Sequence, residues 1–162
     1  WKAGKAEKFH EEIQINDDST GHSYKHVFGR FLDKSVHRIE VDDPYVRINH
    51  QILNFVRFCE LVIKKCPSLK KIVLTTGQDE KCVDQQKSAL EELKGSLTQY
   101  RVNLIVRYSS TLHDRAIRLD NGWTVKIGRG LDYFKPTESR HSIGCCDMDL
   151  RKCHETTINI FH

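Results

Sequence analysis

The feature that most constrains the fold of this chain is a regular alternation of strand-like and helix-like segments over residues 36–108. Period-two alternation and short apolar runs predict strands, whereas apolar residues spaced by three and four predict helices. The segments are, in chain order, a strand Val36–Val41, a helix Asn49–Lys65, a strand Leu69–Thr75, a helix Val83–Tyr100 and a strand Val102–Tyr108. Strands alternating with helices are usually parallel and joined by right-handed crossovers. We therefore expect an α/β fold with a central mixed, mostly parallel sheet flanked by helices.

The two predicted helices differ in how strongly their sequences favour burial. The first has six apolar residues at helical spacing, and Lys64 and Lys65 are favourable in its last turn. In the second, Gly95 lowers the helix propensity by roughly 1 kcal/mol relative to Ala. Its apolar stripe is narrower and consists of Val83, Leu90, Leu93, Leu97 and Tyr100.

The pattern changes after Ser110. Two strand-like runs, Leu112–Asp120 and Trp123–Ile127, meet at Asn121-Gly122, the pair most typical of a type I′ hairpin turn. Residues 131–154 are irregular, and the β-branched run Thr156–Phe161 predicts a last strand. We divide the chain into a polar lead-in segment, residues 1–23, formed by a strand or helix and a loop, and one domain, residues 24–162.

Length and composition restrict the class of protein. A chain of 162 residues can bury a core of its own, and no run of apolar residues exceeds three, which excludes a membrane-spanning helix. Six irregularly spaced cysteines and the absence of an Asn-x-Ser/Thr sequon favour free thiols in a reducing cytosol. Because the chain starts at Trp1 without a secretory signal, we interpret it as a fragment of a longer protein.

The net charge of +4 is concentrated in one stretch. Residues 101–140 hold eight Lys/Arg against four Asp/Glu, whereas the rest of the chain is balanced. A local excess of positive charge attracts anions. The sequence therefore predicts an anionic partner such as a phosphate group.

A constellation suited to phosphate lies inside the basic stretch: His113, Arg115 and Asp120. If residues 112–120 form a strand, His113 and Arg115 project from the same face, where an imidazole and a guanidinium can contact one phosphate. Structural roles remain open. His113 can be a hydrogen-bonded residue at a strand start, and the neighbouring turn explains Asp120. Arg118, Lys126 and Arg129 can equally form a solvated hairpin face.

These residues resemble a degenerate form of the phospholipase D superfamily motif. That motif is His-x-Lys-x4-Asp followed by a glycine segment, and this chain has His113-x-Arg115-x4-Asp120 followed by Gly128. Over nearly its whole length the chain is also similar to the C-terminal domain of MIT domain-containing proteins. The residues that carry this similarity are Asp42, Pro44, Tyr45 and Arg47, followed by Leu119-Asp120-Asn121-Gly122-Trp123 and Gly130-Leu131-Asp132-Tyr133-Phe134.

The resemblance implies a phospholipase D-like fold, a homodimer, and binding of phosphoinositides or other acidic phospholipids. It further implies action with the ESCRT machinery in cytokinetic abscission, with ESCRT-binding MIT helices preceding Trp1. The expected location is cytoplasmic, peripheral on membranes of late endosomes and the midbody. Membranes, a second copy of the chain and ESCRT subunits are the expected partners, and nucleic acid is not.

Departures from the motif favour a binding module over an enzyme. Only one copy of the motif is present, Arg115 replaces the lysine, and Arg129-Gly130 replaces the Ser and Asn that follow the glycine. We therefore expect His113, Arg115 and Asp120 to be a catalytically vestigial motif. The predicted phosphate-binding or lipid-binding residues are His113, Arg115, Arg118, Lys126 and Arg129.

Two other functions stay open. A phosphodiesterase or nuclease can use one His-x-Arg-x4-Asp motif per subunit, with both His113 side chains at a dimer axis. A purely structural dimerisation module would bind neither lipid nor substrate. Cofactors and metals are not expected, because the possible zinc ligands lack the C-x2-C spacing of structural sites. These soft ligands are His141, Cys145, Cys146, Cys153 and His154.

Overall fold

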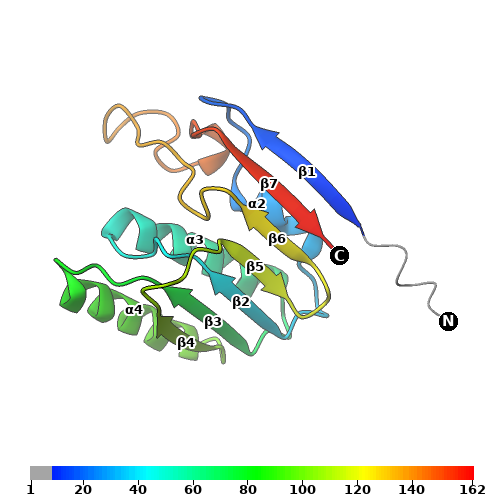
Figure 1. The fold of residues 1–162 in the computed structure, drawn as a ribbon, viewed down its shortest axis with the longest axis vertical. Helices are drawn as coiled ribbons and strands as arrows, with labels where there is room; N and C mark the ends of the chain where they lie inside the picture. Colours follow the sequence, from blue (N-terminus) through cyan, green and yellow to red (C-terminus); the bar gives the residue numbers. More distant parts are fainter. Residues whose placement is uncertain (1–8) are drawn as a thin grey trace.

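The computed structural model of the chain describes residues 9–162, which form one seven-stranded sheet with helices (Figure 1). The strand order is β1-β7-β6-β5-β2-β3-β4. The strands are β1 His10–Ile15, β2 Arg38–Asp42, β3 Lys71–Thr76, β4 Asn103–Tyr108, β5 Ala116–Leu119, β6 Thr124–Ile127 and β7 Thr156–Phe161. The helices are α2 Tyr24–Phe28, α3 Asn49–Lys65 and α4 Val83–Thr98, with short 3₁₀ turns at Gly29–Phe31 and Met148–Leu150.

The α/β architecture with a mixed sheet is confirmed, but the expectation of a mostly parallel sheet is wrong. Within residues 9–162, β2 pairs with β3 and β3 with β4 in parallel, whereas the other four neighbouring pairs are antiparallel. Parallel pairing needs a crossover connection, and only α3 and α4 supply one. After β4 the strands are joined by turns and loops, which allow antiparallel neighbours.

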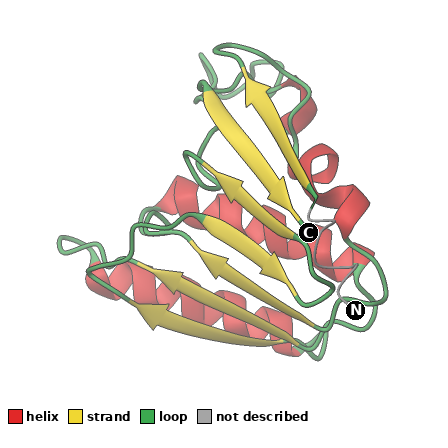
Figure 2. Cartoon of the chain, turned by 45° about the vertical axis from the view of Figure 1, so that its right-hand side comes forward, coloured by secondary structure: helices red, strands yellow, loops and turns green. Residues whose placement is uncertain are grey.

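Helices cover one face of the sheet and leave the other open (Figure 2). In β2 the alternate residues Ile39 and Val41 are fully buried beneath the helices. The short helix α2 joins this layer, because Phe28 packs edge-on against Phe58 of α3 with ring centroids 5.3 Å apart. The open face carries mainly polar residues, with Glu40 of β2 opposite Arg118 of β5. The described residues contain no helix long and apolar enough to cross a membrane.

Helix α3 begins and ends at the predicted residues, whereas α4 ends two residues early. Tyr100, predicted on the apolar stripe of α4, lies beyond the helix and is 61% exposed. A polar residue is buried instead: the Gln86 amide donates hydrogen bonds to the carbonyls of Val46, at 3.0 Å, and Gly77, at 2.8 Å. Gln86 thus ties α4 to the ends of β2 and β3.

The hairpin between β5 and β6 differs from the prediction in two ways. Strand β5 begins at Ala116 and not at Leu112, because the chain must cross from β4 past β3 and β2 before it pairs. Three inter-strand spacings are about 14 Å, which residues 109–115 bridge. The type I′ turn is also wrong, since Gly122 has φ +99° but Asn121 does not have positive φ. The Gly122 amide donates to the Leu119 carbonyl at 3.2 Å.

The lead-in segment contributes a strand to the same sheet. β1 pairs antiparallel with β7, from His10 opposite Phe161 to Ile15 opposite Thr156. The part of the lead-in over residues 1–8 lies outside the described residues. The predicted last strand, β7, is confirmed at both ends, and it lies inside the sheet because β1 covers its outer edge.

Candidate functional site

Three loops meet at one edge of the sheet, which we call the carboxyl edge. The parallel strands β2, β3 and β4 all end there. β5 runs against β2, with Ala116 opposite Asp42, so Arg115 just before β5 lies at the same edge. The turn after β6 also reaches it, because β6 runs against β5. The carboxyl edge thus consists of residues 43–48, 109–115 and 128–132, at the side of an α/β sheet where ligands usually bind.

A buried carboxylate fastens two of these loops together. Asp43 is 1% exposed, and its carboxylate oxygens accept hydrogen bonds of 2.9 Å from the amides of Tyr45 and Leu131. Burial raises the pKa of Asp43, and the two amide bonds and the Arg115 charge oppose that shift. Gly130 has φ +65°, and a Cβ there would collide with the Asp43 carboxylate. The turn after β6 therefore requires glycine at this position.

Two guanidinium groups contact one aromatic ring at the carboxyl edge. The Cζ atoms of Arg47 and Arg115 lie 4.9 and 4.8 Å from the ring centroid of Tyr45. Arg115 also donates from Nη1 to the Gly128 carbonyl at 2.6 Å. These contacts hold the Arg115 side chain in one place while leaving most of its five N–H donors unused.

Two neighbouring cavities open at this edge and share Arg129 and Asp132. The smaller, which we call the edge cavity, has a volume of about 280 Å³. The larger, the loop cavity, has a volume of about 560 Å³. The edge cavity is lined by Tyr45, Gln51, Arg115, Arg129 and Asp132. The loop cavity is lined by His50, Asn54, Arg129, Asp132, Phe134, Lys135, Pro136, Thr137, Arg151 and His154.

Asp132 forms the polar floor that the two cavities share. Its carboxylate accepts hydrogen bonds from Gln51 at 3.2 Å and from Asn54 at 3.4 Å, and it lies 3.3 Å from the Nε2 atom of His50. Arg129 does not pair with this carboxylate. It donates from Nε to the Asp132 backbone carbonyl at 3.1 Å. No ion pair among residues 9–162 includes Arg115 or Arg129, so both guanidinium charges are available to an anion.

Cationic side chains outnumber carboxylates in the lining of the loop cavity, with Arg129, Lys135 and Arg151 against Asp132. Burial lowers the pKa of His154, and the charges of Arg129 and Lys135 lower it further. Lys135 is partly neutralised, because its ammonium lies 2.9 and 2.7 Å from the carboxylates of Asp17 and Asp18. Burial lowers the pKa of Arg151, and nearby Arg57 contributes to that shift. A bound anion would relieve this repulsion between cations.

The structure brings together two of the five predicted binding residues. Arg115 and Arg129 line the edge cavity. Arg118 and Lys126 instead project from β5 and β6 on the open face of the sheet. Arg118 donates to Asp42 at 2.6 Å, and the Lys126 ammonium lies 5.8 Å from the centroid of the Phe161 ring.

The members of the vestigial motif do not form one cluster. His113 is exposed in the connection before β5, so it does not share a strand face with Arg115 as expected. Asp120 follows β5 at the opposite end of that strand, where its carboxylate accepts a hydrogen bond of 2.9 Å from the His37 amide. β5 therefore separates the histidine from the aspartate.

Several residues of the site escaped sequence reasoning. Asp43 and Tyr45 belong to the Asp-Asp-Pro-Tyr run after β2. This run is typical of a turn, and a turn sequence does not indicate contacts with distant loops. Asp132, Arg151 and His154 lie in the irregular stretch, where no periodicity reports their placement. Two signals in the sequence pointed to part of this set: Tyr45 follows a predicted parallel strand, and Tyr45 and Asp132 both lie in segments that carry the family similarity.

The possible zinc ligands between residues 141 and 154 lie in different environments in the structure. Cys153 is buried, His154 lines the loop cavity, and Cys146 is exposed. Within residues 9–162 no three His, Cys, Asp or Glu side chains lie close enough together to hold a metal ion.

Comparison with known proteins agrees with this arrangement. Residues 21–162 match the family model described as a phospholipase D-like domain at the C-terminus of MIT. The chain belongs to this family. MIT domain-containing protein 1 of Mus musculus is 49% identical over 156 residues, which are 96% of this chain and 63% of that protein. The chain thus spans less than two thirds of the length of this relative. The resemblance seen in the sequence and the phospholipase D-like fold are both confirmed.

Proposed function

We propose that the carboxyl edge binds a phosphate-bearing lipid headgroup and that this domain is a peripheral membrane module. The observation that carries the proposal is the pair Arg115 and Arg129, which come from different loops, face one cavity and lack carboxylate partners within the described residues. Guanidinium groups suit phosphate because their N–H donors match its oxygens. Phosphoinositides are the favoured lipids, since cations also outnumber carboxylates in the adjoining loop cavity, which can take a further phosphate.

Membrane binding of this kind is electrostatic. Each basic residue near an acidic membrane contributes on the order of 1 kcal/mol, and the attraction weakens as salt screens it. Tyr45 is 42% exposed beside the edge cavity, and tyrosine favours the interfacial zone of a bilayer. Both features support an orientation with the carboxyl edge toward the membrane.

We propose that the domain is catalytically inactive. Arg115 is engaged by Gly128 and Tyr45, and Asp120 lies at the far end of β5 from His113. Neither arrangement favours a histidine poised as a nucleophile. Hydrolysis of bis-p-nitrophenyl phosphate, phospholipid or DNA by the wild type, lost in His113→Ala, would contradict this part of the proposal.

The wider cellular role rests on the family. A domain found at the C-terminus of MIT proteins can link membranes to ESCRT subunits bound elsewhere in the protein. We propose that it does so in cytokinetic abscission, at the midbody and late endosomes, and as a homodimer. Two linked copies would strengthen membrane binding through effective concentration. Light scattering coupled to gel filtration tests the dimer.

A flotation assay tests the lipid proposal. Phosphatidylcholine vesicles with and without a phosphatidylinositol bisphosphate are the probes. We expect wild type to bind only the acidic vesicles, and Arg115→Gln/Arg129→Gln to bind them about 30-fold more weakly, from about 1 kcal/mol per charge. Lys70→Gln/Lys94→Gln removes two charges from exposed lysines outside the carboxyl edge, and as the charge-matched control it should bind like wild type.

Lys126→Gln separates the two surfaces that carry predicted residues. Binding retained in Lys126→Gln and lost in the Arg115/Arg129 double variant would support the carboxyl edge. Binding lost in Lys126→Gln alone would move the membrane contact to the open face of the sheet. Circular dichroism of each variant checks that the fold is intact.

A further inference from the structure

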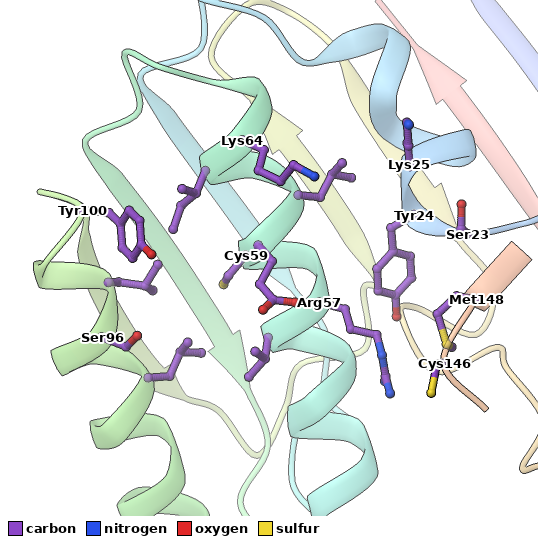
Figure 3. Close-up of a pocket in the computed structure, with 16 residues that line it drawn as sticks. Ser23, Tyr24, Lys25, Arg57, Cys59, Lys64, Ser96, Tyr100, Cys146 and Met148 are labelled. Atoms are coloured by element: carbon purple, nitrogen blue, oxygen red, sulfur yellow. The ribbon is translucent and has the colours of Figure 1, made fainter. Parts of the chain in front are cut away.

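A second concave surface lies on the helical side of the molecule, away from the carboxyl edge (Figure 3). This groove has a volume of about 710 Å³ and runs beside α2, α3 and α4. Its charged residues are Lys25, Arg57, Lys64 and Glu60, so cations predominate. Within residues 9–162, none of these three cations takes part in an ion pair, and Arg57 donates to Asn54 at 2.9 Å. The groove therefore combines a largely apolar lining with an excess of cations, and that excess attracts an acidic ligand.

Two adjacent thiols stand at one end of this groove. Cys146 lines it beside Met148 and opposite Arg57 (Figure 3). The Cys146 Sγ donates to the Cys145 Sγ at 3.7 Å; Cys146 is exposed and Cys145 is half-buried. This separation is only about 1.7 Å longer than a disulfide bond of about 2.05 Å. Cys146 therefore faces the groove, and the Cys145 sulfur lies next to it although Cys145 does not line the groove.

Arg151 holds the thiol pair in place. Its Nε donates to the Gly144 carbonyl at 2.6 Å and its Nη2 to the Cys145 carbonyl at 3.0 Å. Gly144 has φ +94°, a conformation that side chains rarely adopt, and it forms the bend before the pair. The charge of Arg151 opposes the upward shift in the pKa of Cys146 that the hydrogen bond to Cys145 causes.

We propose that Cys145 and Cys146 form a redox-active vicinal dithiol that reacts with acidic low-molecular-weight disulfides bound in the adjoining groove. The site is independent of the proposed lipid binding. The site shares Arg151 with the loop cavity, but its thiols and its groove lie outside the edge cavity that carries the lipid proposal. Variants of Arg115 and Arg129 test the lipid proposal and variants of Cys145 and Cys146 test the dithiol, so either can fail without the other.

The exchange proceeds in two balanced steps. A Cys145 thiolate attacks one sulfur of the small disulfide, forms a mixed disulfide and displaces the first thiolate. Cys146 then loses its proton to solvent and attacks the Cys145 sulfur, which releases the second thiolate. The protein loses two electrons and two protons, and the small disulfide gains them as two thiols.

The order of attack follows from the hydrogen bond between the sulfurs. The bond to Cys145 raises the pKa of Cys146, and the charge of a Cys145 thiolate raises it further. We therefore assign the first attack to Cys145 and the second to Cys146. Consecutive Cα atoms are only about 3.8 Å apart, below the usual range for disulfides, so the ring is strained and readily reduced again.

The remaining cysteines provide a contrast. Burial raises the pKa of Cys66 to about 11 and that of Cys153 to about 11, and it raises the pKa of Cys59 still more strongly. Buried thiols of this kind are inert. Cys82 is half-buried at the start of α4 and serves as the matched control position.

Mass spectrometry of the intact chain after incubation with oxidised glutathione tests the dithiol. We expect wild type and Cys82→Ser to lose two hydrogen atoms without keeping glutathione, because the ring closes. Cys146→Ser should keep one glutathione on residue 145, and Cys145→Ser should react at least tenfold more slowly. Wild type that keeps a glutathione on each of the two residues would overturn the proposal.

A comparison of two disulfides tests the groove. Oxidised glutathione is acidic, whereas cystamine is cationic, and the ratio of their rates reports charge recognition. We expect Arg57→Met and Lys64→Met each to lower that ratio, by up to about tenfold, because attraction of the acidic disulfide is lost. A ratio unchanged in both variants would remove the groove from the reaction and contradict the proposal.

Discussion

The parallel and antiparallel halves of the sheet are built by different means. In the parallel half, β2 to β4, a helix follows each of the first two strands and returns the chain to the next strand. In the antiparallel half, β5 to β7 with β1, strands of four to six residues are held by turns, by loops and by pairing between β1 and β7. The first half is a scaffold with strong local patterns. The second supplies Arg115 and Arg129.

The candidate site lies where the halves join. β2 and β5 are the neighbouring strands at which pairing changes from parallel to antiparallel. Tyr45 and Gln51 come from the parallel half, and Arg115 and Arg129 come from the antiparallel half. Asp43 bonds across the joint to Leu131. A site assembled in this way depends on how firmly the two halves are fastened.

The strongest test removes that fastening. Asp43→Asn keeps the shape of the side chain but replaces one carboxylate oxygen with an amide nitrogen. That nitrogen cannot accept a hydrogen bond, so the backbone amide of either Tyr45 or Leu131 loses its acceptor. We expect the free energy of unfolding to fall by about 3 kcal/mol, measured by urea denaturation, because a buried amide loses a charged partner. Glu12→Gln, on the exposed edge strand, should change it by less than about 0.5 kcal/mol. Equal effects of both variants would contradict the role of Asp43.

Two glycine substitutions compare the backbone conformations of the two halves through their effects on the free energy of unfolding. Gly122 in the antiparallel hairpin has φ +99°, and a Cβ would lie 3.0 Å from the His162 ring. We expect Gly122→Ala to lower the free energy of unfolding by about 2 kcal/mol. Gly95 in α4 has open space around it, so Gly95→Ala should raise it by about 0.5 to 1 kcal/mol. Changes of the same sign would show that local backbone geometry does not distinguish the halves.

A smaller effect, which depends on pH, is expected at the long loop of the antiparallel half. Asp149 accepts hydrogen bonds from the Ser23 amide at 3.1 Å and from His26 at 2.8 Å, which hold the start of α2. Partial burial raises the pKa of Asp149, but these bonds and the His26 charge outweigh it, so the pKa lies below 3.8. Asp149→Asn should cost about 0.5 to 1 kcal/mol near pH 6.

The sign of the pH dependence follows from linkage. A carboxyl whose pKa is lowered by folding stabilises the protein above its unfolded pKa and loses that contribution as pH falls through the folded value. The difference between wild type and Asp149→Asn should therefore shrink below pH 3.8. A difference that stays constant in urea denaturation from pH 6 to pH 2 would exclude an ionic role for Asp149.

Local sequence patterns were sufficient for the parallel half. The bounds of α3 and the positions of β2 to β4 follow from periodicities within each segment, because helix and strand spacing are local properties. They were also sufficient for β7, whose residues strongly favour strands. The sequence did not show which strands pair with each other, because paired strands lie far apart along the chain. A count of helices and strands therefore overstated the parallel share of the sheet.

The charge excess and the identity of its carriers, including Arg115 and Arg129, could be read from the residues alone. Tertiary structure decided which of them share a cavity. Arg115 meets Arg129 because β5 and β6 pair antiparallel and return the chain to the carboxyl edge, whereas Arg118 and Lys126 face the open side of the same strands. The reason is physical: side-chain type is a property of one residue, but proximity depends on strand pairing between distant segments.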